Sequence, residues 1–412
     1  GFAVLIRVSV HNLGFWADCW VFLLRPYFLD PWEAFVSHAL RSGRPGDIVY
    51  QYPMLRMVGF QAREWMVVSC FWLAAASLLC GACLRRSFPE FRLLYLGAPL
   101  LVFFSAAFNP LVYRMDLDQG RLCVLFFWMS ASCYQVFILR RERGFVQSIH
   151  WWLLAGFTYF YSLMCYEASL LLFPAVAVML FPLWLRLNER IRKRALVESV
   201  TMMVLVPAIY MVMRYTILGG GKDKPLRYVP RLDGFPEAAW NSVEYLVAPA
   251  QHIRWDLSTG LVFLVFVIAV LVFLFRVADR PRREFEPNQL RRQAVIAIAL
   301  GGVILCAGAV PFLLGKYQYD RVEFVGHSRV LVASYYGFVI ALLTAVSIVR
   351  SLWFRRVVLA GIATLVAGGA TLTYDLHRDW ENVSDISARM WRDFFRQVPD
   401  VQEKTYFLFK GI

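Results

Sequence analysis

The chain has 412 residues, of which 59% are hydrophobic and only 17% are charged, and its mean hydropathy is +0.53. This composition excludes a soluble globular domain, in which about a quarter of the residues are charged. The formal net charge is +14, so the distribution of the basic residues decides whether that charge indicates a nucleic-acid partner or a membrane topology.

Ten apolar stretches are suited to crossing a hydrocarbon layer about 30 Å thick. They fall at 65–84, 93–113, 122–139, 149–164, 168–185, 196–213, 257–275, 294–314, 330–349 and 357–374. Residues 1–10 have the composition of the end of one more span, and we expect the natural chain to continue beyond both ends of this sequence. The pattern predicts an all-α polytopic membrane protein with about 10 to 11 transmembrane helices.

The loops between these stretches alternate in charge. Five short loops, among them "LRRSFPEFR" and "RRERG", together carry 20 Lys and Arg residues. Loops rich in Lys and Arg remain on the cytoplasmic side of a membrane, so topology explains much of the net charge and we expect no nucleic-acid partner. The opposite face then holds the loops 11–64, 109–121, 214–256 and 315–329. We expect a multi-pass protein of a bacterial inner membrane, with its active face toward the periplasm.

The first outer loop opens with Asp18 in "WADCWVFL", between Trp16 and Trp20. Tryptophans are typical of the membrane interface, and a carboxylate there has either a raised pKa or a cationic partner. Both conditions suit a general base that works on a lipid-linked substrate. The alternative is an acid that caps an interfacial helix.

The stretch "DPWEAFVSHALRSGRPGD" predicts such an interfacial helix further along the same loop. Asp30 is expected to cap it, Pro31 to occupy its first position, and an apolar stripe to begin at Trp32. Gly43 and "RPGD" are expected to end it. Its charged residues are most simply a solvated face.

The short loop "YRMDLDQGR" places Asp116 and Asp118 two residues apart, between Arg114 and Arg121. Two carboxylates at this spacing can share a divalent cation, Mg²⁺ or Mn²⁺, or they can pair with the flanking arginines.

Glu167 lies at the turn between two spans and is an ionisable residue at membrane depth, which is costly and points to either chemistry or a hydrogen bond within the hairpin. His327 and Arg329 precede a later span, where they can bind a phosphate or, for the arginine, simply reach the interface. Cys80 and Cys83 have the spacing of a redox motif but sit in an apolar helix, so we predict that they serve as packing residues.

The last 38 residues, 375–412, predict an amphipathic helix, a turn that contains proline, and a strand. We interpret them as the start of an extracytoplasmic segment that follows a transmembrane domain of residues 1–374.

This layout resembles the GT-C superfamily of polytopic glycosyltransferases, which use sugars linked to polyprenyl phosphate. The resemblance rests on the acid in "WADCWVFL", the long first loop with "ALRSGRPGDIVYQYPMLR", the "YEASLLLFP" hairpin, "GHSRVLVAS" before a span, and a Trp-containing helix after the last span. It implies an inverting sugar transfer on the outer face, within the cell envelope, to a protein, lipid or glycan acceptor.

The resemblance also implies roles for individual residues. Asp18 would be the catalytic base, or would share a metal site with Asp116 or Asp118, and Glu167 would tune the site. Arg329 and His327 would hold the donor phosphate. Two other classes remain open on the residues alone: an envelope polysaccharide polymerase or ligase, and a non-catalytic multispan subunit or transporter with partners in a membrane complex.

Overall fold

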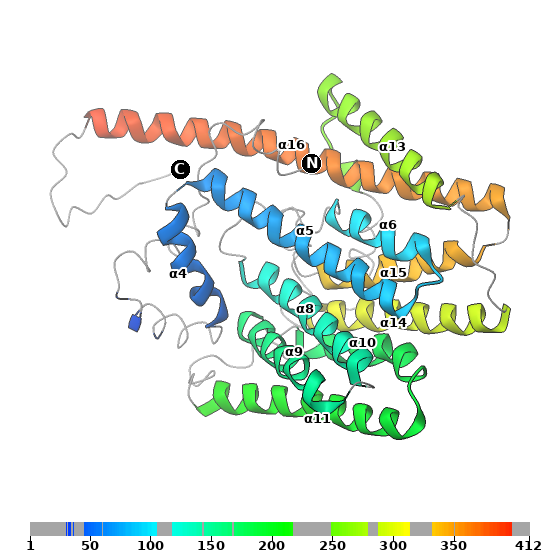
Figure 1. Cartoon of the computed structure of the whole chain (residues 1–412). Coiled ribbons are helices and arrows are strands. Elements are labelled where there is room, and N and C mark those ends of the chain that lie inside the picture. Colours follow the sequence, from blue (N-terminus) through cyan, green and yellow to red (C-terminus); the bar gives the residue numbers. More distant parts are fainter. Residues whose placement is uncertain are drawn as a thin grey trace.

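The computed structural model describes residues 30, 32, 33, 36, 45–59, 61–104, 118–141, 144–166, 169–216, 249–278, 287–313, 332–349 and 351–397. Within these residues the chain is almost entirely helical and contains no strand. The elements are α4 (Gly46–Val58), α5 (Ala62–Ser87), α6 (Arg92–Phe103), α8 (Asp118–Arg140), α9 (Phe145–Cys165), α10 (Ser169–Trp184), α11 (Glu189–Thr216), η4 (Pro249–His252), α13 (Leu257–Ala278), α14 (Pro287–Leu313), α15 (Val332–Ile348) and α16 (Leu352–Gln397) (Figure 1).

Each of the ten predicted spans overlaps one helix of this series. Among the described residues, six helices are long and apolar enough to cross a membrane, namely α5, α8, α11, α13, α14 and α16. α6, α10 and α15 contain shorter apolar segments. The protein is therefore an all-α, integral, multi-pass membrane protein, as the hydropathy pattern predicted.

Basic residues close several helices at one end of the bundle. Arg85 and Arg86 occupy the last turn of α5, Arg140 the last turn of α8 and Arg276 the last turn of α13. A cation in the last turn is favoured by the partial negative charge of the free carbonyl groups. We call this end, which includes the basic loops after α5, α8 and α10, the basic end, and the opposite end, where α4 lies, the α4 end.

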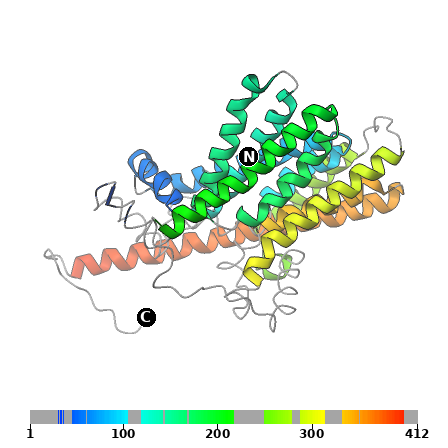
Figure 2. The ribbon, with the colours of Figure 1, turned by 90° about the horizontal axis from the view of Figure 1, so that it is seen from below.

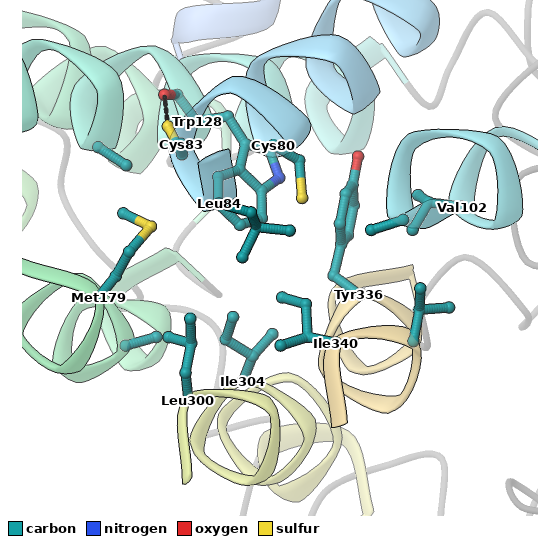
Figure 3. Close-up of a cluster of buried hydrophobic side chains, with 14 of the residues drawn as sticks. Cys80, Cys83, Leu84, Val102, Trp128, Met179, Leu300, Ile304, Tyr336 and Ile340 are labelled. Carbon is teal, nitrogen blue, oxygen red and sulfur yellow. Dashed lines mark hydrogen bonds between the residues drawn. The ribbon is translucent and has the colours of Figure 1, made fainter. Parts of the chain in front are cut away.

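The core is a continuous apolar cluster built by residues from most of the helices. Figure 3 shows side chains of α5, α6, α8, α10, α14 and α15 meeting there, with Trp128 and Tyr336 among the largest. Cys80 and Cys83 are fully buried in it, and the Cys83 thiol donates to the Trp128 carbonyl at 3.9 Å. The prediction that these cysteines are packing residues of a helix is confirmed.

α14 and α15 pack closely against each other. A Cβ built on Gly337 of α15 would lie 2.3 Å from the Leu305 nitrogen and 2.4 Å from the Gly301 oxygen, both on the α14 backbone. Small residues let membrane helices approach in this way, because dispersion contacts rather than the hydrophobic effect hold them together in lipid.

The last predicted span and the amphipathic helix after it form one helix. α16 has 46 residues, which at 1.5 Å per residue is about 69 Å and roughly twice the thickness of a hydrocarbon core. In both ribbon views its second half runs on past the ends of the neighbouring helices (Figures 1 and 2). The predicted turn and strand after Gln397 lie outside the described residues.

The described part of the first outer loop contains two helical pieces, of which the sequence predicts one. The backbone nitrogen of Trp32 donates to Oδ1 of Asp30 at 2.8 Å, and residues 32, 33 and 36 are helical, so the cap by Asp30 is confirmed. α4 was not predicted, because "RPGD" suggests a helix stop. Instead, Pro45 precedes the first residue of the helix, where its missing N–H costs nothing.

Candidate functional site

Five of the six predicted site residues, Asp18, Asp116, Glu167, His327 and Arg329, lie outside the described residues. The sixth, Asp118, is the first residue of α8, and its side chain also lies outside them. The convergence of these groups and their roles therefore stay predictions. The described helix ends beside them in sequence form the candidate site.

The start of α8 and the end of α9 lie side by side at the α4 end. The Ser162 hydroxyl donates to the Cys123 carbonyl at 2.8 Å, and the Cys123 thiol donates to the Tyr166 carbonyl at 3.6 Å. Asp118 is five residues before Cys123, and Glu167 directly follows Tyr166. The helix end at Asp118 and the helix end before Glu167 are therefore neighbours.

Arg121 is the buried charge of this region. It sits one turn after Asp118 on α8, and only 1% of its surface is exposed. A guanidinium taken out of water requires polar or negative groups around it, because its lost hydration otherwise costs several kcal/mol. The sequence suggested Arg121 only as a partner of the neighbouring acids, and its complete burial was not predicted.

Tyr50 of α4 lies within electrostatic reach of Arg121. Its hydroxyl accepts a hydrogen bond from the Trp72 indole at 2.9 Å. Burial raises the pKa of Tyr50, while the positive charge of Arg121 and the bond from Trp72 act in the opposite direction. At neutral pH the phenol therefore stays protonated beside the cation.

α4 is fastened over this region at both ends. The Tyr161 hydroxyl donates to the Gly46 carbonyl at 2.7 Å, and the Trp65 indole donates to the Gly59 carbonyl at 2.9 Å. A Cβ on Gly46 would lie 2.8 Å from the backbone nitrogen of Cys165, so only glycine allows this approach. α4 packs on both α8 and α9, and its Tyr50 lies near Arg121 in the first turn of α8.

A second polar cluster ties the start of α13 to α16. Arg254 pairs with Asp375, whose Oδ2 also accepts from the Arg254 backbone nitrogen at 3.1 Å, and with Asp379. Asp256 pairs with Arg378. Ile253 packs against Leu372 in the same region. The cluster therefore fixes residues 253–256 against α16 just beyond its apolar part.

Asp256 is also the cap of α13. Its Oδ1 accepts bonds from the Ser258 hydroxyl at 2.6 Å and from the Thr259 nitrogen at 2.9 Å. These bonds, together with the one from Arg378, hold the pKa of Asp256 well below its usual range. The "DLST" sequence is a helix-cap signal that could have been found, whereas nothing in the sequence indicated a pair 122 residues apart.

The described residues contain no group of three or more His, Cys, Asp or Glu side chains that could hold a metal ion. The side chains of the predicted cation ligands Asp116 and Asp118 lie outside the described residues. The divalent cation therefore stays a prediction.

These features define a multi-pass membrane protein with a buried arginine close to a short, tightly fastened helix. Comparison with protein-family models, with curated proteins and with solved structures finds no match to this chain.

Proposed function

We propose that the protein is a membrane glycosyltransferase of the GT-C kind. It transfers a sugar from a polyprenyl-phosphate donor to a protein, lipid or glycan acceptor at the extracytoplasmic face of a bacterial inner membrane. In the reaction the acceptor oxygen attacks the anomeric carbon and the bond from that carbon to the phosphate oxygen breaks. The acceptor proton passes to a carboxylate base, and polyprenyl phosphate leaves as an anion.

The observation that carries this proposal is the burial of Arg121, close to Tyr50 of α4. Negative charge develops on the departing phosphate, and the base must be ionised before it can accept a proton. A fixed cation shielded from water stabilises the negative charge on the phosphate. It also favours the ionised base, since an opposite charge within about 4–6 Å lowers a carboxyl pKa by 1–3 units. Arg121 lies one helical turn from Asp118 and near the helix end that precedes Glu167.

The remaining roles follow the resemblance. Asp18 is the base that accepts the acceptor proton, and Glu167 adjusts the charge of the site. Arg329 and His327 bind the donor phosphate, for which arginine offers two parallel N–H groups. Asp116 and Asp118 would hold a divalent cation, which when bound neutralises charge on the phosphate.

The test is a transfer assay in liposomes that contain the purified protein and membrane extract as acceptor. Synthetic polyprenyl-phosphate sugars with labelled hexose, pentose or aminopentose groups are supplied, and release of polyprenyl phosphate is measured together with labelled product. We expect turnover of one donor and a loss of at least roughly 100-fold on Asp18→Asn, which is the contribution typical of a general base.

Asp30→Asn is the matched control, because it makes the same change in the same loop at a residue that caps a helix. Turnover that survives Asp18→Asn would contradict the assignment of the base and would favour an envelope polymerase or ligase. Absence of turnover with every donor class, together with co-purification of a partner complex, would favour a non-catalytic subunit.

A further inference from the structure

Arg86, at the basic end of the bundle, is held by neutral groups. Its Nη1 donates to the Ser132 hydroxyl at 2.7 Å and to Oε1 of Gln135 at 3.3 Å. No carboxylate among the described residues pairs with it. The side chain is only half-buried, so the charge is fixed in place but not neutralised.

A chain of buried polar groups sets the direction of this guanidinium. The Gln135 amide nitrogen donates to the Cys83 carbonyl and to the Ser87 hydroxyl, each at 2.8 Å. The Ser87 hydroxyl in turn donates to the Met179 carbonyl at 2.7 Å. The amide is thereby locked with its oxygen toward Arg86, and the chain links α5, α8 and α10.

Arg141 shows what such a guanidinium binds when a partner is present. Its Nε and Nη2 donate to the two carboxylate oxygens of Glu198 at 2.9 and 2.7 Å. This edge of the fork matches two oxygens of a carboxylate or a phosphate. On Arg86 only Nη1 donates to the described residues, and the corresponding edge, Nε and Nη2, is left for an external anion.

A second arginine reaches the same turn of α5. Nη1 of Arg186 donates to the Arg86 carbonyl at 3.4 Å, and Arg186 is exposed and forms no ion pair among the described residues. Arg85 is exposed beside them. Three positive charges at one helix end repel one another unless an anion lies between them.

We propose that Arg86 and Arg186 bind the phosphate of an anionic membrane lipid. Arg86 lies in the last turn of a helix long and apolar enough to cross a membrane, which is the level of the lipid headgroups. A phosphodiester offers the two oxygens that the open edge of Arg86 requires, and Arg186 neutralises the rest of its charge. The site lies at the end of the bundle opposite to α4 and does not depend on the proposed transferase activity.

Native mass spectrometry of the intact chain tests this binding. The protein, extracted in a mild detergent, is mixed with phosphatidylglycerol, phosphatidylcholine or inorganic phosphate, and the lipids retained are counted. We expect one phosphatidylglycerol to be retained preferentially, and its affinity to fall by roughly tenfold or more in Arg186→Gln, since a bond between charged partners contributes about 1.5–3 kcal/mol.

Arg86→Lys keeps the charge and removes the two-pronged edge, so it is expected to weaken binding by a similar factor. Arg190→Gln is the matched control, because Arg190 is an exposed arginine at the start of α11 and carries the same charge. An equal loss in Arg190→Gln would show general attraction to anionic lipid and overturn the site.

Two further outcomes would contradict the proposal. Inorganic phosphate that displaces the lipid at equal concentration would overturn the lipid as the ligand of the site. Unchanged affinity in Arg186→Gln would overturn the role of Arg186. Arg186→Gln removes an exposed side chain, so it keeps the test valid if an Arg86 variant fails to fold.

Discussion

The close contact of α14 and α15 makes Gly337→Ala the sharpest structural test. The new methyl group would lie 2.3 Å from the Leu305 nitrogen, 2.4 Å from the Gly301 oxygen and 2.8 Å from the Leu305 Cα. All three atoms belong to the α14 backbone, so no side chain can rotate away from the methyl group. The two helices must instead separate locally by about 1 Å to restore normal contact distances.

Two opposing effects set the change in the free energy of unfolding caused by Gly337→Ala. Replacing glycine by alanine within a helix gains up to about 1 kcal/mol, because alanine loses less backbone entropy. Forcing a methyl group against backbone typically costs about 1–3 kcal/mol, and a gap of 0.5–1 Å forfeits about a quarter to a half of the dispersion energy of each contact it opens. We therefore expect a net destabilisation of about 1–2 kcal/mol.

Gly302→Ala is the matched control, because nothing lies within 4 Å of a Cβ at Gly302, the residue next to Gly301 on α14. It should be neutral, or more stable by up to about 1 kcal/mol. Apparent melting temperatures of both variants, measured in detergent at one scan rate, should differ by roughly 1–4 °C in a chain of this length. A Gly337→Ala protein as stable as Gly302→Ala would refute the contact.

Three further changes test other described interactions. Arg141→Gln should lower the free energy of unfolding by about 1–3 kcal/mol, because Glu198 is left without its partner in a largely buried place. Adding Glu198→Gln should recover part of that loss in a double-mutant cycle. Strict additivity of the two changes would contradict a direct ion pair. Tyr50→Phe should lower the free energy of unfolding by about 1–2 kcal/mol, because the Trp72 indole loses its acceptor. Tyr52→Phe removes an exposed bond from Arg56 and should change it by almost nothing. Equal shifts of the two melting temperatures would refute the stabilising role of the bond from Trp72 to Tyr50. Folding lowers the pKa of Asp256, so its bonds stabilise the fold fully above the unfolded pKa of about 3.9 and are lost as the pH falls through the lower folded pKa. Asp256→Asn should therefore flatten the dependence of stability on pH below about pH 4. An unchanged acid profile of stability in this variant would contradict the lowered pKa.

The spans were predictable because they depend on composition within a short window. A run of about 20 apolar residues must form a helix in lipid, where every backbone group needs an internal partner. All ten predicted spans accordingly overlap helices, and Asp30 caps its helix as its position before Pro31 predicted.

What the sequence did not predict depends on contacts between distant residues. α4 has little hydrophobic patterning of its own, and it is held by Tyr161 and Trp65 from other helices. The bond between Asp256 and Arg378 joins residues 122 positions apart. Such pairings require the packing of whole helices, which no local pattern contains.

The arginines explain why a count of charges predicts topology but not chemistry. Orientation in a membrane responds to the number of positive residues in short loops and takes little account of what they bind later. Among the described residues Arg141 pairs with Glu198 and Arg378 pairs with Asp256, whereas Arg86 bonds to neutral oxygens and keeps its charge. The first two pairings hold elements together, because both charges belong to the protein. A guanidinium that the fold fixes without neutralising it has part of its hydrogen-bonding capacity left for an external anion. Arg86 is therefore more informative about a ligand than any of the paired arginines.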